Sequence, residues 1–355
     1  MKDLVREELG ALHRYEIPHP PSIRAKLDAN ENPWPLPAEV ARELAAHLAE
    51  VALHPYPDGA CERLRALVAA DLGRAPDEIA FGNGSDELIT LLIATFARPR
   101  AGATRARIAY PWPSFVVYRI ATLAHGCEPV EIPLRPDFEL DRDATDAALA
   151  AARPNLLFLA LPNNPTGTLW PRAEVVRLLE RHRDMLVVAD EAYLAYSGRG
   201  HLDLLAAHPN LVVMQTLSKI GMAALRVGYL TADRALVHEL EKIRPPYNVG
   251  AVNQAAAAFL LERHRPLLAE QAARVVAERE RLAAALARVP GLTVFPSKAN
   301  FLLVRCDGAT ALWQRLAERG VLVRSFDRPG PLAGCLRVTV GTPEENDLLL
   351  SALLV

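Results

Sequence analysis

The sequence predicts an α/β fold in which helices flank a central, mostly parallel sheet, with a smaller α+β domain after it. Helix-like stretches alternate with short apolar runs, among them residues 156–161, 185–189 and 211–214. This alternation is typical of sheets whose parallel strands are joined by crossover helices. The chain has 355 residues, 51% of them hydrophobic, which is enough to bury the cores of about two domains.

The predicted elements follow in order along the chain. Residues 1–40 are rich in proline and are expected to form an extended N-terminal arm that packs across a cleft. Residues 41–247 are the predicted large domain, and residues 248–355, which begin with an alanine-rich helical stretch, are the predicted small domain. Other apolar runs are expected to be strands of these two domains. They are residues 79–81, 107–110 and 226–230 in the large domain, and 292–295, 300–304 and 336–340 in the small one.

Composition argues against several classes of protein. A net charge of −2 and an isoelectric point near 6.6 give no electrostatic footprint for nucleic acid or an anionic membrane. The four cysteines show no CxxC spacing, so we expect neither a disulfide framework nor a metal site. The first residues include acids, and no apolar run approaches the ~18 residues that a membrane span needs. We therefore expect a cytoplasmic protein.

Three polar side chains come just after the three apolar runs named above. They are Asn164, Asp190 and Lys219, and Tyr193 follows Asp190 by three residues. The carboxyl ends of parallel strands meet at one edge of a sheet, where ligands of such folds collect. The sequence therefore predicts that an amide, a carboxylate, a phenol and an amine share one site.

This set of groups suits a bound pyridoxal phosphate. Lys219 would form a Schiff base with the cofactor aldehyde and later move a proton on the substrate. Asp190 would pair with the pyridine nitrogen and keep it protonated, which strengthens electron withdrawal by the ring. Tyr193 and Asn164 would hydrogen-bond the phenolic oxygen of the ring.

A phosphate site is predicted beside these residues. Ser85 and Asp86 begin an apolar helix, whose free backbone N–H groups face an anion, although plain helix capping favours the same residues. Ser218 supplies a hydroxyl group, and Arg226 supplies a guanidinium fork that suits phosphate.

These motifs resemble those of fold-type I pyridoxal phosphate aminotransferases over nearly the whole chain. The motifs that carry the resemblance are NNPTG at residues 163–167, DEAY at 190–193, and SK at 218–219 with Arg226. Within that group the chain is most similar to the histidinol-phosphate aminotransferase family. The finer similarity rests on DANENP at 28–33, YPD at 56–58, GNGSDE at 82–87, PPYNV at 245–249 and LRVTVGT at 336–342.

The resemblance implies roles for further residues. Phe115 would stack on the cofactor face, with Trp112 as the competing candidate. Tyr56 would reach the cofactor phosphate of a neighbouring subunit, which implies a homodimer. Arg324 and Arg337 would receive the substrate phosphate, and Arg337 would also grip the α-carboxylate of the second substrate.

Four residues are expected to line the substrate cleft: Tyr15, Asn30, Asn164 and Tyr247. The segment between Lys219 and Arg226 departs from the commonest family form, because Ala224 stands where a glycine usually precedes Leu-Arg.

The activity implied is amino transfer between L-histidinol phosphate and 2-oxoglutarate, giving imidazole acetol phosphate and L-glutamate, in L-histidine biosynthesis. Two enzymes with the same pocket remain as alternatives, an aromatic amino acid aminotransferase and an O-phosphothreonine decarboxylase. A remote alternative is a module that senses pyridoxal phosphate without turnover.

Overall fold

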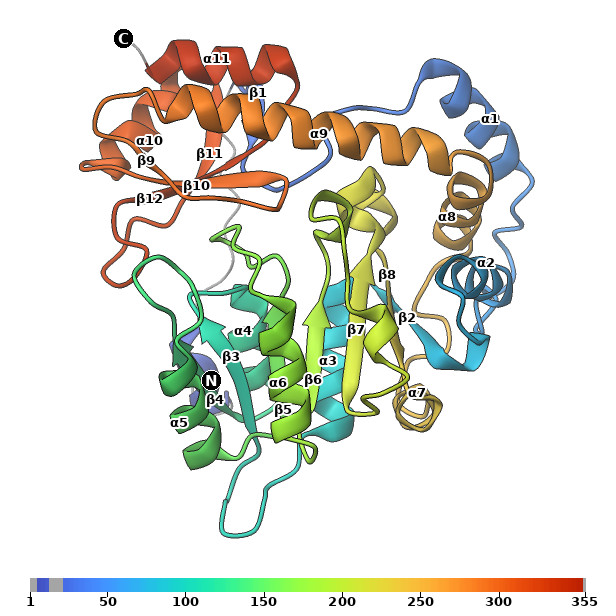
Figure 1. Ribbon diagram of the computed structural model, residues 1–355. Coiled ribbons are helices and arrows are strands. Elements are labelled where there is room, and N and C mark those ends of the chain that lie inside the picture. The colour runs from blue at the N-terminus through green and yellow to red at the C-terminus, as the bar shows by residue number, and fades with distance from the viewer. Residues whose placement is uncertain (1–4, 13–21, 354–355) are drawn as a thin grey trace.

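Figure 1 shows the computed structural model, which describes residues 5–12 and 22–353. In this part of the chain the larger sheet has seven strands, in the order β2-β8-β7-β6-β5-β3-β4. Strand β8 runs antiparallel to both of its neighbours, and the other neighbouring strands are parallel. The bounds are β2 (Ile79–Asn83), β3 (Arg107–Trp112), β4 (Glu128–Pro133), β5 (Leu156–Ala160), β6 (Leu186–Asp190), β7 (Leu211–Thr216) and β8 (Val227–Ala232).

Helices cover both faces of this sheet, whose central strands are apolar at most positions. On β5, Leu156 and Phe158 pack in one cluster with helices α3, α4 and α7, while Leu157 and Leu159 pack on the opposite face with α5 and α6. Side chains alternate between the two faces of a strand, so a strand buried on both sides reads as a continuous apolar run. The bounds are α3 (Ser85–Phe96), α4 (Val116–Ala124), α5 (Arg142–Ala152), α6 (Arg172–Arg181) and α7 (Arg234–Glu241).

Three further helices pack together beside the β2 and β8 edge, and their buried residues form one cluster with Ile79 and Val227. They are α1 (Ala38–Ala49), α2 (Glu62–Leu72) and α8 (Ala251–Arg263). Figure 1 shows the long helix α9 (Arg265–Leu286) running from beside α8 across to the second sheet.

The second sheet has five strands in the described residues, in the order β1-β11-β12-β10-β9. Strand β1, close to the start of the chain, pairs in parallel with β11, and the other pairs are antiparallel. Helices α9, α10 and α11 contribute to the core on this sheet. The bounds are β1 (Ala25–Leu27), β9 (Thr293–Val294), β10 (Phe301–Arg305), β11 (Val321–Ser325), β12 (Cys335–Thr339), α10 (Ala309–Glu318) and α11 (Pro343–Leu353).

Short 3-10 helices occupy several connections, and two of them carry the turn between β7 and β8. They are η2 (Glu7–Ala11), η3 (Pro76–Glu78), η4 (Leu194–Tyr196), η5 (Leu202–Leu204), η6 (Leu217–Ile220) and η7 (Ala223–Leu225). Lys219 lies in η6, directly after β7.

The predicted fold class is confirmed, and each of the apolar runs named above overlaps a strand. Strands β1, β4 and β11 lie outside those runs. Strand β4 contains Pro129 and Pro133, which weaken a strand signal, and it lies at the edge of the sheet, where proline is tolerated. The domain boundaries stay a prediction; strand β1, inside the predicted arm, joins the sheet formed by the C-terminal part of the chain.

Among the described residues, none of the helices combines the length and the apolar character needed to cross a membrane. The same residues contain no group of three or more His, Cys, Asp or Glu placed to hold a metal ion.

Candidate active site

Asp190 ends strand β6 as a buried carboxylate with two hydrogen-bond donors. The hydroxyl of Tyr118 donates to Oδ2 at 2.6 Å, and the backbone N–H of Ala192 donates to Oδ1 at 3.2 Å. Burial raises the pKa of Asp190 to about 6, while the two hydrogen bonds act in the opposite direction. A carboxylate in this position is held ready to pair with a cation.

Lys219 lies on the neighbouring turn, after β7. Its side chain is half-buried, and Nζ is 5.9 Å from the centroid of the Tyr193 ring. Burial lowers the pKa of Lys219 to about 8, and the charge of Arg337 adds to the effect. The hydroxyl of Tyr196 donates to the backbone carbonyl of Lys219 and so fixes the turn. A much larger share of this amine is therefore neutral near pH 7 than for a solvated lysine.

Asn164 follows β5 and is bonded to Arg337 on the second sheet. Nη1 of Arg337 donates to Oδ1 of Asn164 at 2.6 Å, and Nη2 donates to the carbonyl of Asp28 at 2.6 Å. All three residues are buried. Since Oδ1 of Asn164 already accepts a hydrogen bond, its Nδ2 amide is the part suited to donate to a ligand oxygen.

Tyr193 belongs to a buried network with Asn30 and Thr339. Nδ2 of Asn30 donates to Tyr193 Oη at 2.9 Å, and Thr339 Oγ1 donates to Oδ1 of Asn30 at 3.0 Å. Burial raises the pKa of Tyr193 to about 12, so the phenol keeps its proton. Because Asn30 fills an acceptor position of Oη, the proton of that hydroxyl can be donated to a ligand. That Asn30 lines the substrate cleft stays a prediction.

A group of donors gathers where α3 begins. Arg226 Nη1 donates to Ser218 Oγ at 3.5 Å, and Arg226 Nη2 pairs with Oδ2 of Asp86 at 3.2 Å. Ser85 is the first residue of α3, and no side chain caps this helix start. Its first backbone N–H groups are therefore orphan donors of the helix.

Two glycines make room for this group of donors. Gly84 has φ +77°, and a Cβ there would lie 2.6 Å from Nη2 of Arg226. At Gly228 a Cβ would lie 2.6 Å from the backbone nitrogen of Ser85. Helix N–H groups, a hydroxyl and a guanidinium form a donor set that fits a phosphate. With Asp190 and Lys219 nearby in the same fold, these residues fit pyridoxal phosphate.

Arg324 and Arg337 are direct partners in the pairing of β11 with β12. Side chains of directly opposed residues leave the same face of a sheet, so the two arginines belong to one face of the second sheet. Arg337 also packs against two rings, with its Cζ 5.4 Å from the centroid of Phe301 and 5.6 Å from that of Phe326. That the two arginines bind the anionic end of the substrate stays a prediction.

The two candidates for the stacking ring lie close together in the fold. Trp112 is the last residue of β3 and Phe115 precedes α4, and both are half-buried against the same core cluster. Phe115 packs edge-on against Tyr118, with centroids 5.6 Å apart. That Phe115, rather than Trp112, stacks on the cofactor stays a prediction.

Tyr56 and Tyr247 stack on each other at the surface. Their ring centroids are 4.6 Å apart and the rings are inclined by only 10°. Tyr56 is 79% exposed and Tyr247 is 47% exposed. An exposed aromatic pair is available to a second protein molecule. Tyr15, the remaining predicted residue, lies outside the described residues.

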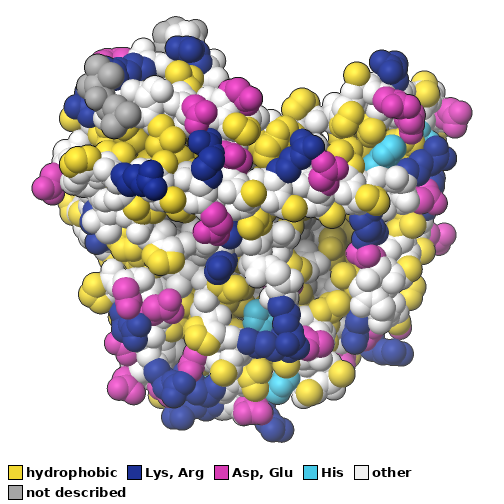
Figure 2. Space-filling model, turned by 45° about the horizontal axis from the view of Figure 1, so that its top comes forward, with side chains coloured by type: hydrophobic (Ala, Val, Ile, Leu, Met, Phe, Trp, Pro, Cys, Tyr) yellow, Lys and Arg dark blue, Asp and Glu magenta, His cyan; other side chains and the backbone are white. Residues whose placement is uncertain are grey.

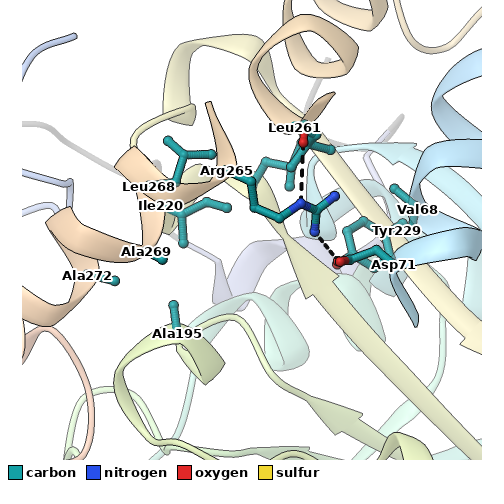
Figure 3. Close-up of a pocket in the computed structure, with 11 residues that line it drawn as sticks. Val68, Asp71, Ala195, Ile220, Tyr229, Leu261, Arg265, Leu268, Ala269 and Ala272 are labelled. Atoms are coloured by element: carbon teal, nitrogen blue, oxygen red, sulfur yellow. Dashed lines mark hydrogen bonds and ion pairs between the residues drawn. The ribbon is translucent and has the colours of Figure 1, made fainter. Parts of the chain in front are cut away.

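A cavity of about 290 Å³ lies behind the turn that carries Lys219. Figure 3 shows that it is lined mainly by apolar side chains, with an ion pair between Asp71 and Arg265 at its side. None of the predicted site residues lines it, although Leu217 and Ile220 come from the same turn as Lys219. The predicted residues at the strand ends therefore form a group separate from this cavity.

Sequence reasoning missed Tyr118 and the network around Glu191. Glu191 is buried and accepts hydrogen bonds from Gln215 Nε2 at 2.9 Å and from the backbone N–H of His201 at 2.6 Å. This network ties the end of β6 to the end of β7. Tyr118 lies three residues after Phe115, one helical turn away, but the sequence alone does not tell which strand end its hydroxyl meets.

The chain surface carries no dominant charge on the face shown in Figure 2, where Lys and Arg side chains are interspersed with Asp and Glu. This face therefore offers no broad electrostatic attraction for a charged ligand.

A family model for class I and II aminotransferases matches residues 23–353. The chain therefore belongs to the class I and II aminotransferase family. A histidinol-phosphate aminotransferase from Chromobacterium violaceum is 46% identical over 355 residues, which cover 99% of this chain and 98% of that protein. Within the class, the chain belongs to the histidinol-phosphate aminotransferases.

Two solved structures are similar in fold. The histidinol-phosphate aminotransferase from Sinorhizobium meliloti, in complex with pyridoxal-5'-phosphate, superposes with a TM-score of 0.85 at 26% identity, covering 98% of this chain and 96% of that one. An L-threonine-O-3-phosphate decarboxylase from Porphyromonas gingivalis superposes with a TM-score of 0.75 at 24% identity, covering 93% of this chain and 98% of that one. The second likeness concerns the fold alone.

Proposed function

We propose that this chain is a histidinol-phosphate aminotransferase that moves an amino group between L-histidinol phosphate and 2-oxoglutarate in L-histidine biosynthesis. The observation that carries the proposal is the bond from Arg337 to Asn164, which joins Arg337 to the end of β5 in the large sheet, and Arg324 is the direct strand partner of Arg337. The similarity to histidinol-phosphate aminotransferases over 99% of the chain supports the choice of substrate. Because L-histidinol phosphate is a phosphate ester and 2-oxoglutarate is a dicarboxylate, and such anions do not cross membranes freely, we place the enzyme in the cytoplasm.

The cofactor is pyridoxal phosphate, which when bound withdraws electrons from the substrate carbon that loses its proton. Arg226, Ser218 and the first N–H groups of α3 would hold its phosphate, with Ser85 and Asp86 at the helix start. Asp190 would pair with the ring nitrogen. Tyr193 and the Nδ2 amide of Asn164 would donate to the phenolic oxygen, and Phe115 or Trp112 would cover the ring.

Lys219 is the residue that bonds the cofactor and carries the proton. The pKa of about 8 leaves a useful fraction of neutral amine near neutral pH. Once released by the substrate, the same amine would take the proton from the substrate carbon and return it to the cofactor side. Burial serves this role because it disfavours the charged ammonium.

Arg324 and Arg337 would bind the anionic end of each substrate in turn. Histidinol phosphate presents a phosphate, and glutamate presents carboxylates, and a guanidinium group can bind either with two hydrogen bonds. Asn30 and Tyr247 would line the cleft, as would Tyr15. Tyr56 would reach the cofactor phosphate of a partner subunit in a homodimer, which its exposure supports.

The test is a single half-reaction. Purified enzyme loaded with pyridoxal phosphate is mixed with L-histidinol phosphate alone, with L-phenylalanine alone, or with O-phosphothreonine alone, and pyridoxamine phosphate and CO2 are measured. Fast formation of pyridoxamine phosphate from histidinol phosphate, with slow formation from phenylalanine, supports the proposal. The reverse preference identifies an aromatic aminotransferase. CO2 release from phosphothreonine identifies a decarboxylase, and cofactor binding without any product identifies a sensing module.

A further inference from the structure

Tyr118 is a buried phenol whose hydroxyl contacts the carboxylate of Asp190. It lies in the first turn of α4, and the O–H group donates to Oδ2 at 2.6 Å. The other oxygen of Asp190 accepts the longer bond from Ala192, at 3.2 Å. Both side chains are shielded from solvent. A short hydrogen bond to a buried carboxylate is among the stronger ones in a protein.

The ring of Tyr118 is fixed by other aromatic residues, so its hydroxyl has a defined direction. It stacks on Phe158 of β5 with centroids 4.9 Å apart and an interplanar angle of 15°. Phe115 packs against it edge-on, at 90°. Tyr110 lies on a third side, with centroids 6.1 Å apart. A ring held on three sides cannot turn its oxygen elsewhere without displacing the core.

The protonation states match this geometry. Burial and the charge of Asp190 raise the pKa of Tyr118 well above its ordinary value, so the phenol remains a donor. The pKa of Asp190 is raised by burial and, more weakly, by the carboxylates of Asp86 on α3 and Glu191 after β6. Against these, the bonds from Tyr118 and Ala192 favour the ionised form. The phenol of Tyr193 also faces this site and stays neutral.

We propose that Tyr118 is a positioning residue that keeps Asp190 ionised and oriented toward the pyridine nitrogen of the cofactor. The inference rests on the role of Asp190 proposed above. Without the hydroxyl, one oxygen of a buried carboxylate would lose its partner, and the acid form would become more populated at neutral pH. An acid form cannot form the ion pair with a protonated ring nitrogen.

The test compares Tyr118→Phe with Tyr110→Phe. The control removes the same atom from a neighbouring buried ring, whose hydroxyl bonds Glu131 at 3.3 Å instead of Asp190. The dissociation constant of pyridoxal phosphate is measured by equilibrium dialysis of the apoenzyme from pH 5.5 to 8.5, with the thermal midpoint of each variant alongside. Changes in the protonation of the free cofactor are the same for all variants and cancel in the comparison.

The expected result for Tyr118→Phe is a dissociation constant raised roughly ten- to a hundredfold below pH 7, as for the loss of a hydrogen bond to a charged group. The difference should narrow at pH 8.5, where Asp190 is ionised without help. The pH midpoint of binding therefore moves upward, while Tyr110→Phe keeps the wild-type midpoint. The inference would be overturned if Tyr118→Phe weakened cofactor binding by the same factor at every pH. It would also be overturned if Tyr118→Phe and Tyr110→Phe moved the pH midpoint of binding by the same amount.

Two further variants distinguish a failure of the proposed role of Asp190 from a failure of the proposed role of Tyr118. Asp190→Asn should lose most cofactor affinity and its pH dependence; unchanged binding would refute the role of Asp190 and this inference with it. If Asp190→Asn behaves as expected and Tyr118→Phe shows no midpoint shift, only the role of Tyr118 is refuted. Should Tyr118→Phe fold poorly, 3-fluorotyrosine at position 118 provides a more acidic donor of nearly the same shape. The midpoint should then move downward, and an unmoved midpoint would contradict the proposal.

Discussion

Arg337 donates a 2.6 Å hydrogen bond to the side-chain oxygen of Asn164, and this bond joins the small sheet to the large one. Asn164 follows β5, whereas Arg337 lies in β12. The predicted substrate-binding cation is therefore oriented by a predicted cofactor ligand. If the two residues have their proposed roles, changing either one should affect substrate recognition and cofactor orientation together.

Arg337→Lys should lower kcat/KM for histidinol phosphate and for glutamate together, by roughly ten- to a hundredfold. A lysine can replace the charge but cannot reach Asn164 and Asp28 with a planar fork. Steady-state kinetics with each substrate measures the effect. Arg305→Lys is the matched control, because Arg305 also packs against two rings, those of Phe138 and Phe295. A loss confined to one substrate would contradict a role shared by both half-reactions.

Asp190→Asn should stabilise the apoenzyme at neutral pH although it impairs cofactor binding. The pKa of Asp190 is raised from 3.8 to about 6, so the folded state binds more protons than the unfolded state between these values, and stability falls as pH rises through this window. Asparagine avoids the buried charge, for a gain on the order of 1–3 kcal/mol above pH 6. Urea unfolding at pH 4 and pH 7 measures this gain, which should be much smaller at pH 4. Equal gains at both values would mean that the carboxylate charge is not the cause.

Gly84→Ala should weaken the binding of pyridoxal phosphate, because the added methyl group would press on the guanidinium of Arg226. Gly291→Ala is a matched control, since Gly291 has the same φ of +77° but no atom within 4 Å of the added Cβ. Both variants should lose stability through the unfavourable backbone conformation, by roughly 1 kcal/mol. Only Gly84→Ala should also raise the cofactor dissociation constant, severalfold or more. Similar affinities for both variants would count against Arg226 as a phosphate ligand.

Mixing two inactive variants tests the predicted homodimer. Lys219→Ala lacks the reactive amine, and Tyr56→Ala lacks the phenol that would reach the partner site. A hybrid dimer has one site with Lys219 from one chain and Tyr56 from the other, and that site should be active. After unfolding and refolding an equal mixture, activity should return to about a quarter of the wild-type value, since half of the dimers are hybrids with one good site each. No recovery above the sum of the separate variants would mean that Tyr56 acts within its own chain or not at all.

The positions of Asn164, Asp190 and Lys219 could be predicted because each follows an apolar run long enough to be a buried strand. The rule that parallel strands end at one edge then brings them together. Tyr118 could not be assigned in this way. Its neighbours Tyr110, Phe115 and Phe158 read equally well as core residues, and the contact with Asp190 depends on how α4 packs on β5 and β6.

Register limits sequence reasoning in the same way. Arg324 and Arg337 were expected to act together, but their direct pairing depends on the register of β11 against β12. A slip of one residue would turn the side chains of one strand to the other face of the sheet. Strand β1 is only three residues long, and its parallel partner lies at the other end of the chain. A short segment carries too little pattern to specify such a distant partner.

The pairing of β1 with β11 also orders events during synthesis. The segment Ala25–Leu27 leaves the ribosome long before Val321–Val323, to which it binds. The small sheet therefore cannot be completed until β11 has emerged, and the buried apolar residues of β1 must wait for their partner while the large sheet already has all its strands. Pairing between two such distant segments is slow. Until β1 pairs with β11, the exposed apolar residues of the chain can aggregate or be bound by chaperones.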